Sequence, residues 1–217
     1  MKTKTIAAVI CLVLFLLLIA AVKTVDVAPI GPEETSIGLS GINGAIHEAT
    51  GVSKLLYKLT NYLGYLSILA GLCFALYGLI QLIQRKSLLK VDREILVLGC
   101  LLVVLALLYV LFEFVVINFR PVVMPGEAHP EASFPSSHTM LTFVILGSIM
   151  MIIGRYVKNR SLRTLIQVIC GLLILVMVFG RLLSGVHWFT DILGGVLISG
   201  ALLFLFAAVL DKVTEKQ

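Results

Sequence analysis

Charged side chains are scarce in this sequence, because Asp, Glu, Lys and Arg make up only 13% of its 217 residues while hydrophobic residues make up 59%. A soluble globule of this size needs more polar surface than this composition supplies. The net charge of +5 does not indicate nucleic acid as a partner, because the distribution of the charges matters more than their sum. We therefore expect an integral membrane protein that binds no nucleic acid.

Paired cysteines are also missing. The four cysteines lie inside apolar runs and none is part of a CxxC pair: Cys11, Cys73, Cys100 and Cys170. This pattern excludes a disulfide framework and a cysteine zinc site. We find no internal repeat and no low-complexity segment, so we expect a single domain over residues 1–217 that needs neither a metal nor a cofactor.

Long apolar runs dominate instead. They lie at 5–22, 59–84, 95–118, 136–154, 164–183 and 188–210, and each is long enough to cross a bilayer as a helix. The first run also fits the core of a secretory signal, but it is longer than such cores usually are and ends in a poor cleavage site. We predict an all-α bundle of six transmembrane helices in which this first span is retained.

The basic residues are distributed unevenly between the two sides of these spans. Twelve of the 17 Lys and Arg residues fall on the side of the two termini, and five fall on the other side. The positive-inside rule then places both termini in the cytoplasm. We expect a plasma-membrane protein with three extracytoplasmic segments, at 23–56, 119–135 and 184–187. Within the first of them, a short amphipathic helix over 42–56 is expected.

Three ionisable residues, Arg181, His187 and Asp191, interrupt the apolar stretch from 164 to 210. Charged groups in such a stretch need partners and usually mark function. His187 and Asp191 are four residues apart, so they share one face if both lie in the first turns of a helix. The carboxylate can then orient the imidazole as a nucleophile. Taken alone, the pair fits a capped histidine at a helix end equally well.

Two further polar pieces are expected on the same side of the membrane. Arg120-Pro121 follows the third span, and Pro135-Ser136-Ser137-His138 begins the fourth. Arginine presents a planar fork of donors to phosphate oxygens, and a helix N-terminus offers free N–H groups to an anion. Alone, the first piece fits an interfacial anchor and the second a helix cap. Their coincidence with the third piece indicates a phosphate site.

This set of residues predicts a chemistry that uses no metal. His187, oriented by Asp191, can attack phosphorus, and His138 can protonate the leaving oxygen. Water activated by a histidine then releases the product. His129 is interpreted as a solvated loop residue, because it stands between two glutamates in the 119–135 loop.

The order R-P, P-S-x-H and R-x5-H-x3-D resembles the type 2 phosphatidic acid phosphatase superfamily, which comprises membrane lipid-phosphate phosphatases related to the vanadium haloperoxidases. The resemblance covers about residues 113–195. It implies six spans and an extracytoplasmic site, with His187 forming a phosphohistidine, Asp191 as its partner and His138 as general acid. The phosphate-binding residues that it implies are Arg120, Arg181, Ser136 and Ser137.

The chain departs from the family pattern at three positions. Ser137 replaces a glycine, Gly180 replaces a serine, and Glu113 stands where the pattern has lysine. A carboxylate inside a span is costly unless a cation pairs with it. We expect Glu113 to pair with Arg120 or Arg181 and to hold that guanidinium in place. The alternative is that Glu113 points toward the interface and contacts water.

The resemblance favours hydrolysis of a lipid phosphate or diphosphate in the outer leaflet, with undecaprenyl diphosphate as the first choice. A phosphatidylglycerophosphate or phosphatidate phosphatase is the alternative within the same class. A transporter, or a lipid-binding scaffold with a degenerate site, is the alternative from a different class. Transport predicts polar groups or broken helices near the midplane. Apart from Glu113, the span interiors contain few such groups.

Overall fold

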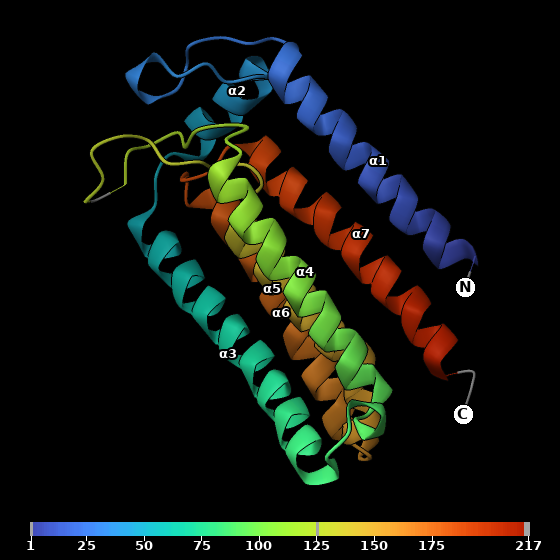
Figure 1. Ribbon diagram of the computed structural model, residues 1–217. Coiled ribbons are helices and arrows are strands. Elements are labelled where there is room, and N and C mark those ends of the chain that lie inside the picture. Colours follow the sequence, from blue (N-terminus) through green and yellow to red (C-terminus); the bar gives the residue numbers. More distant parts are fainter. Residues whose placement is uncertain (1, 125, 215–217) are drawn as a thin grey trace.

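The computed structural model describes residues 2–124 and 126–214, and most of this part is helical (Figure 1). Its helices are α1 Lys2–Thr24, η1 Pro32–Glu34, α2 Ser40–Thr50, α3 Lys54–Arg85, η2 Leu88–Lys90, α4 Arg93–Phe114, α5 Ser137–Tyr156, α6 Arg160–Leu183 and α7 Phe189–Thr214. All of these except η1, α2 and η2 are long and apolar enough to cross a membrane. The predicted all-α class and the six spans are confirmed.

α5 and α7 form the centre of the bundle. They pack against each other, α1 and α4 contact α7, and α3, α4 and α6 contact α5. The inner faces of α5 and α7 are buried, whereas α1, α3 and α4 expose rows of Leu, Ile and Val outward. Exposed apolar rows of this kind suit the acyl chains of a bilayer.

Small residues allow the central helices to approach closely. A Cβ atom at Gly195 would lie 3.1 Å from the carbonyl oxygen of Ser136, and one at Gly194 would lie 2.7 Å from the ring of Phe134. The hydroxyl of Ser199 also donates to the carbonyl oxygen of Met140, at 3.4 Å. α7 therefore lies against the start of α5 because its residues there are small.

Two helices end earlier than predicted. α4 ends at Phe114 rather than at 118, because a β-branched run follows and leads to Pro121. The helix expected over 42–56 is α2, which stops at Thr50 because Gly51 adopts a φ of +60°. The chain then starts α3 at Lys54 with Ser53 as its N-cap.

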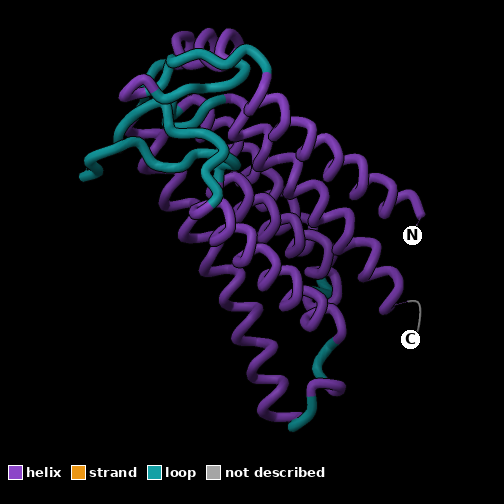
Figure 2. Tube along the Cα trace, turned by 45° about the horizontal axis from the view of Figure 1, so that its top comes forward, coloured by secondary structure: helices purple, strands orange, loops and turns teal. Residues whose placement is uncertain are grey.

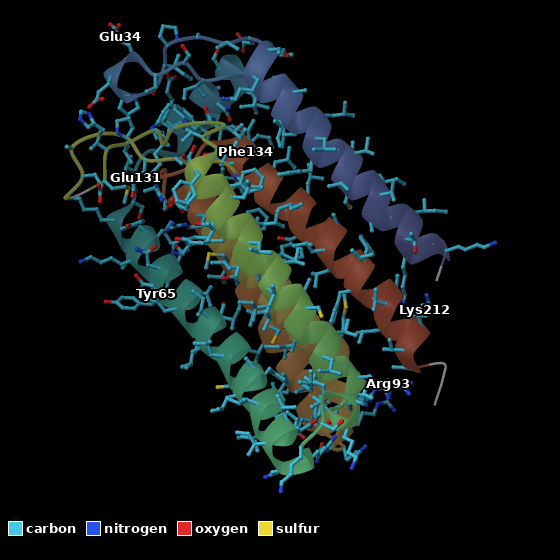
Figure 3. The ribbon with its side chains drawn as sticks, viewed as in Figure 1. Glu34, Tyr65, Arg93, Glu131, Phe134 and Lys212 are labelled. Atoms are coloured by element: carbon cyan, nitrogen blue, oxygen red, sulfur yellow. The ribbon has the colours of Figure 1, made fainter. Side chains whose placement is uncertain are left out.

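The longer loops gather at one end of the bundle, together with α2 (Figure 2). The antiparallel bridge between Phe119 and Ala132 joins the two sides of one loop. The start of α1, the end of α7 and the short α3–α4 and α5–α6 connections lie at the opposite end, where the labelled Arg93 and Lys212 are seen (Figure 3). This division matches the two sides expected from the distribution of basic residues.

We predict that the end holding the 119–135 loop is extracytoplasmic, because the opposite end carries most of the basic residues. The exposed Glu127 is replaced by cysteine in a variant whose four native cysteines are alanine, and an impermeant thiol reagent is applied to intact cells. Rapid labelling is expected. Lys90→Cys in η2 is the matched control and should react only after permeabilisation. The reverse pattern would mean that the protein is inserted the other way round.

Candidate active site

His187 lies in the short turn between α6 and α7, and Asp191 lies in the first turn of α7. Both side chains are buried, and Nδ1 of His187 is 3.5 Å from Oδ2 of Asp191. That oxygen also accepts a hydrogen bond from the backbone N–H of Trp188, at 2.9 Å. Within the described chain, Nε2 of His187 has no hydrogen-bond partner. The imidazole therefore has a carboxylate on one edge and a free nitrogen on the other.

The protonation state of His187 suits a nucleophile. Burial first, and then the positive charges of Arg120 and Arg181, hold its pKa well below the usual range. The ring is neutral at physiological pH for that reason, and a ring nitrogen keeps the lone pair that attack requires.

The turn that carries His187 is tied to two other parts of the chain. The indole N–H of Trp188 donates to the carbonyl oxygen of Phe119, at 2.7 Å. The backbone N–H of Ser136 donates to the carbonyl oxygen of Asp191, at 2.9 Å. The three pieces expected to converge, around Arg120, before α5 and between α6 and α7, are thus brought to one end of the bundle.

Arg181 is fully buried in the last turn of α6, and its guanidinium contacts the start of α3. Nη1 donates to the hydroxyl of Thr60, at 3.2 Å, and to the amide oxygen of Asn61, at 2.9 Å. The guanidinium carbon also lies 5.4 Å from the centre of the Tyr57 ring. These neutral partners orient Arg181 without cancelling its charge.

The same guanidinium determines the tautomer of His138. Nη2 of Arg181 lies 3.0 Å from Nδ1 of His138. Because arginine can only donate, Nδ1 must accept, and the ring hydrogen of His138 is on Nε2. His138 lines a large cavity, and a Cβ atom at Gly64 would lie 2.7 Å from its ring. The glycine leaves the space that this ring occupies.

Arg120 approaches from the irregular segment after α4. Its Nε is 3.1 Å from Oε2 of Glu131, yet neither Nε nor Nη1 makes an aligned hydrogen bond within the described residues.

Among the expected phosphate ligands, Ser137 begins α5 and lines the cavities beside Arg120. Ser136 is fully buried, and its hydroxyl oxygen accepts from Thr139, at 3.1 Å. Ser136 thus supports the start of α5.

Several buried nitrogen atoms at this end of the bundle have no hydrogen-bond partner in the described part of the chain. They are Arg120 Nε, Arg120 Nη1, Arg181 Nε, His187 Nδ1 and His187 Nε2. Buried polar groups are normally paired, because an unpaired one costs about 1–3 kcal/mol. The unpaired nitrogens of the two guanidinium groups, next to the N–H groups of a helix start, are suited to bind an anion, whereas the neutral imidazole keeps a lone pair for attack.

Two cavities meet at Arg120. A small one of about 40 Å³ is lined by His187, Arg120, Ser137 and the two carboxylates Glu113 and Glu131. A large one of about 1310 Å³ lies between α3, α4 and α5, and it reaches from η2 at one end to His138 and Arg120 at the other. Most of its lining side chains are aliphatic or aromatic. The anion site therefore opens onto a long apolar space between α3, α4 and α5.

Glu113 does not hold the position that the sequence predicted. It is exposed at the end of α4, where it is hydrogen-bonded to Tyr109, and none of the described ion pairs joins it to Arg120 or Arg181. The carboxylate beside Arg120 is that of Glu131, because the Phe119–Ala132 bridge places Arg120 and Glu131 side by side. Figure 3 shows Glu131 in the loop beside the end of α4.

Other residues of the site were not found by sequence reasoning. Asn118 donates to Oδ1 of Asp191, at 3.4 Å, and Thr60, Asn61 and Tyr57 surround Arg181. The sequence could have identified Asn118 as a site residue, because it is an isolated amide in an apolar stretch, two residues before Arg120. No sequence pattern could have identified the three α3 residues, because they lie far from the motifs in sequence.

Comparisons with known proteins identify a family and a similar fold. A model of the PAP2 superfamily matches residues 99–215. A crystal structure described as the first transmembrane PAP2 type phosphatidylglycerolphosphate phosphatase, from Bacillus subtilis, has a TM-score of 0.65 with 22% sequence identity. The match covers 95% of this chain and 97% of that chain, so the two share a fold. A comparison with curated proteins gives no significant match.

We predict that Glu131→Gln weakens orthophosphate binding by about threefold to tenfold, because Arg120 loses the half-exposed carboxylate that holds its Nε edge. Glu113→Gln is the matched control, since it neutralises the other carboxylate of the same cavity, and its effect should stay below about twofold. Calorimetric titration of the purified protein measures both. A larger loss of phosphate affinity in Glu113→Gln than in Glu131→Gln would mean that Glu113, and not Glu131, holds Arg120 in place.

Proposed function

The chain belongs to the PAP2 superfamily, and from that premise we propose that it hydrolyses a long-chain lipid diphosphate, foremost undecaprenyl diphosphate, through a phosphohistidine on His187. Family membership supports hydrolysis of a lipid phosphate. The observation that carries the finer proposal is the cluster of unpaired nitrogens of Arg120, Arg181 and His187 at the end of a long apolar cavity. The nitrogens suit the phosphates and the cavity suits the chain.

The first step forms a bond between Nε2 of His187 and the terminal phosphorus. The bond from that phosphorus to the bridging oxygen breaks, and its electron pair stays on the departing lipid monophosphate. Positive charge develops on the imidazole and is stabilised by Asp191, whose carboxylate is 3.5 Å from Nδ1. The guanidinium groups of Arg120 and Arg181 stabilise the negative charge on the phosphoryl oxygens.

The second step is hydrolysis of the phosphohistidine. Water attacks the phosphorus and the bond to Nε2 breaks, so that His187 regains its lone pair. One proton of the water passes to a phosphoryl oxygen, and orthophosphate leaves. Neither step calls for a metal ion, because the two arginines supply the positive charge.

The tautomer of His138 favours a diphosphate over a phosphate monoester. With Nδ1 accepting from Arg181, the ring has a single hydrogen, on Nε2, to offer to the leaving oxygen. A neutral imidazole is a good hydrogen-bond donor but a weak acid. A hydrogen bond suffices when a phosphate monoester anion leaves, whereas an alkoxide needs a proton. Phosphatidate and phosphatidylglycerophosphate would both release an alkoxide.

The large cavity supports an isoprenoid or acyl chain as part of the substrate. It extends along α3 and α4 from Leu88 and Val91 up to His138. A long apolar chain fits along it while the diphosphate lies at Arg120 and Arg181. With the orientation expected from the positive-inside rule, the reaction takes place at the outer leaflet of the plasma membrane.

The substrate is tested by phosphate release from undecaprenyl diphosphate, phosphatidate and phosphatidylglycerophosphate, with purified protein and EDTA present. We expect undecaprenyl diphosphate to give the highest kcat/KM and EDTA to have no effect. The name of the Bacillus subtilis protein makes phosphatidylglycerophosphate the main competitor, but at 22% identity the similarity shows the fold alone. A higher kcat/KM for that lipid would replace the diphosphate proposal. Inactivity on all three would favour a lipid-binding scaffold.

We predict that His187→Ala abolishes turnover and removes the acid-labile phosphoenzyme, because the nucleophilic nitrogen is lost. Rapid quenching with a lipid diphosphate labelled at its terminal phosphate measures both quantities. His129→Ala is the control, since that ring is exposed in the 119–135 loop, where it pairs with Glu33. Its activity should stay near wild type. Phosphate release above about a tenth of wild type in His187→Ala would exclude His187 as the nucleophile.

We predict that His138→Ala lowers kcat by about a hundredfold or more on an alkyl phosphate and by much less on a diphosphate. The reason is that the alkoxide that leaves an alkyl phosphate depends strongly on a hydrogen from Nε2 of His138, whereas the phosphate that leaves a diphosphate does not. An aryl phosphate with the same chain, whose leaving group needs no proton, should be affected least. An equal loss on all three substrates would show that His138 does not act on the leaving oxygen.

A further inference from the structure

The turn that carries His187 is covered on its outer side by α2 and its flanking residues, which lie at the loop end of the bundle (Figure 1). The contacts between the two are close. A Cβ atom at Gly185 would lie 1.9 Å from the carbonyl oxygen of Gly51, and Gly185 has a φ of +67°. The backbone N–H of Ser53 donates to the carbonyl oxygen of Ser184, at 3.1 Å. The segment 38–53 thus lies directly against residues 184–190.

Asn43 is the polar centre of this contact. Its side chain is fully buried, and all three of its hydrogen bonds are to groups outside α2. Nδ2 donates to the hydroxyl of Thr190, at 3.0 Å, and to the carbonyl oxygen of Gly38, at 2.9 Å. Oδ1 accepts from the backbone N–H of Thr190, at 3.2 Å. One amide therefore holds both the backbone and the side chain of Thr190, three residues after His187.

The imidazole of His187 depends on this outer support. Neither of its ring nitrogens makes an aligned hydrogen bond to any described residue, and Oδ2 of Asp191 is already bonded to the backbone N–H of Trp188. The position of the ring thus depends on the backbone around it, which includes the backbone of Ser133 beside the ring. That backbone is held from inside by the Trp188–Phe119 hydrogen bond and from outside by Asn43.

We propose that Asn43 is a positioning residue of the reaction, and that the segment 38–53 aligns His187 for attack. The inference rests on the proposed function of His187. Asn43 contacts none of the groups expected to bind phosphate, so its loss should leave substrate affinity intact. In-line attack depends on sub-ångström placement, so a shift of the 187–190 backbone should slow the chemical step.

The test compares kcat and KM of Asn43→Ala, Thr190→Val and Thr190→Ser on the best substrate. Asn43→Ala should lower kcat by about tenfold to a hundredfold and change KM by less than about twofold. Thr190→Val removes the hydroxyl but keeps the N–H, so its loss should be smaller. Thr190→Ser keeps both groups and should restore near-normal turnover. The rate of phosphoenzyme formation should fall in parallel with kcat.

Asn159→Ala is the matched control. Asn159 is the N-cap of α6 at the opposite end of the bundle, where Oδ1 accepts from the N–H of Leu162, at 3.0 Å. Its loss should lower thermal stability, as the loss of a cap does, without a change in kcat. If Asn43→Ala lowers thermal stability while kcat stays within about twofold of wild type, Asn43 has a structural role only and the proposal is wrong.

Two further outcomes separate this proposal from the one on which it rests. If His187→Ala is inactive while Asn43→Ala and Thr190→Val both turn over normally, the phosphohistidine mechanism stands and the positioning role fails. If His187→Ala remains active, the mechanism itself fails. A rise in KM equal to the fall in kcat for Asn43→Ala would also contradict the proposal, because the segment would then act on binding.

Discussion

The burial of positive charge inside an apolar bundle is the constraint on which the rest of this structure depends. A guanidinium group in a membrane-spanning helix is costly unless its donors are satisfied. Arg181 meets part of this requirement with Thr60 and Asn61, and Arg120 lies beside Glu131. Several of their N–H groups are nevertheless left without a partner. A bound anion would accept hydrogen bonds from these groups and so recover the residual cost, which is why the site suits the phosphate of the proposed function.

The same constraint explains the packing of α5 and α7. The start of α5 must come close to Asp191, and glycines in the first turns of α7 leave room for the chain before and at the start of α5. Phe134 lies against Gly194, and Ser136 lies against Gly195. Larger residues at these two positions would push the start of α5, and with it His138, away from the turn that carries His187. The central helices thus determine the geometry of the site as well as the stability of the bundle.

Much of the fold and the centre of the site were predictable from sequence. Apolar length located the six spans, and the residues around His138, Arg181 and His187 stood out because polar groups are rare in this chain. The partners of those residues were not predictable. Asn43 and Asn61 make tertiary contacts that no local pattern encodes, and α2 was expected without any link to the turn that carries His187. Glu113 was paired wrongly because the helix was assumed to continue past Phe114.

The large cavity between α3, α4 and α5 has a consequence for kinetics. A lipid that occupies it is drawn from the plane of the bilayer rather than from water, and a dephosphorylated chain returns to that plane. Encounter is then a two-dimensional process. The rate then depends on the mole fraction of substrate among the surrounding lipids or detergent. Adding lipid or detergent should therefore slow the enzyme, whereas adding aqueous buffer should not.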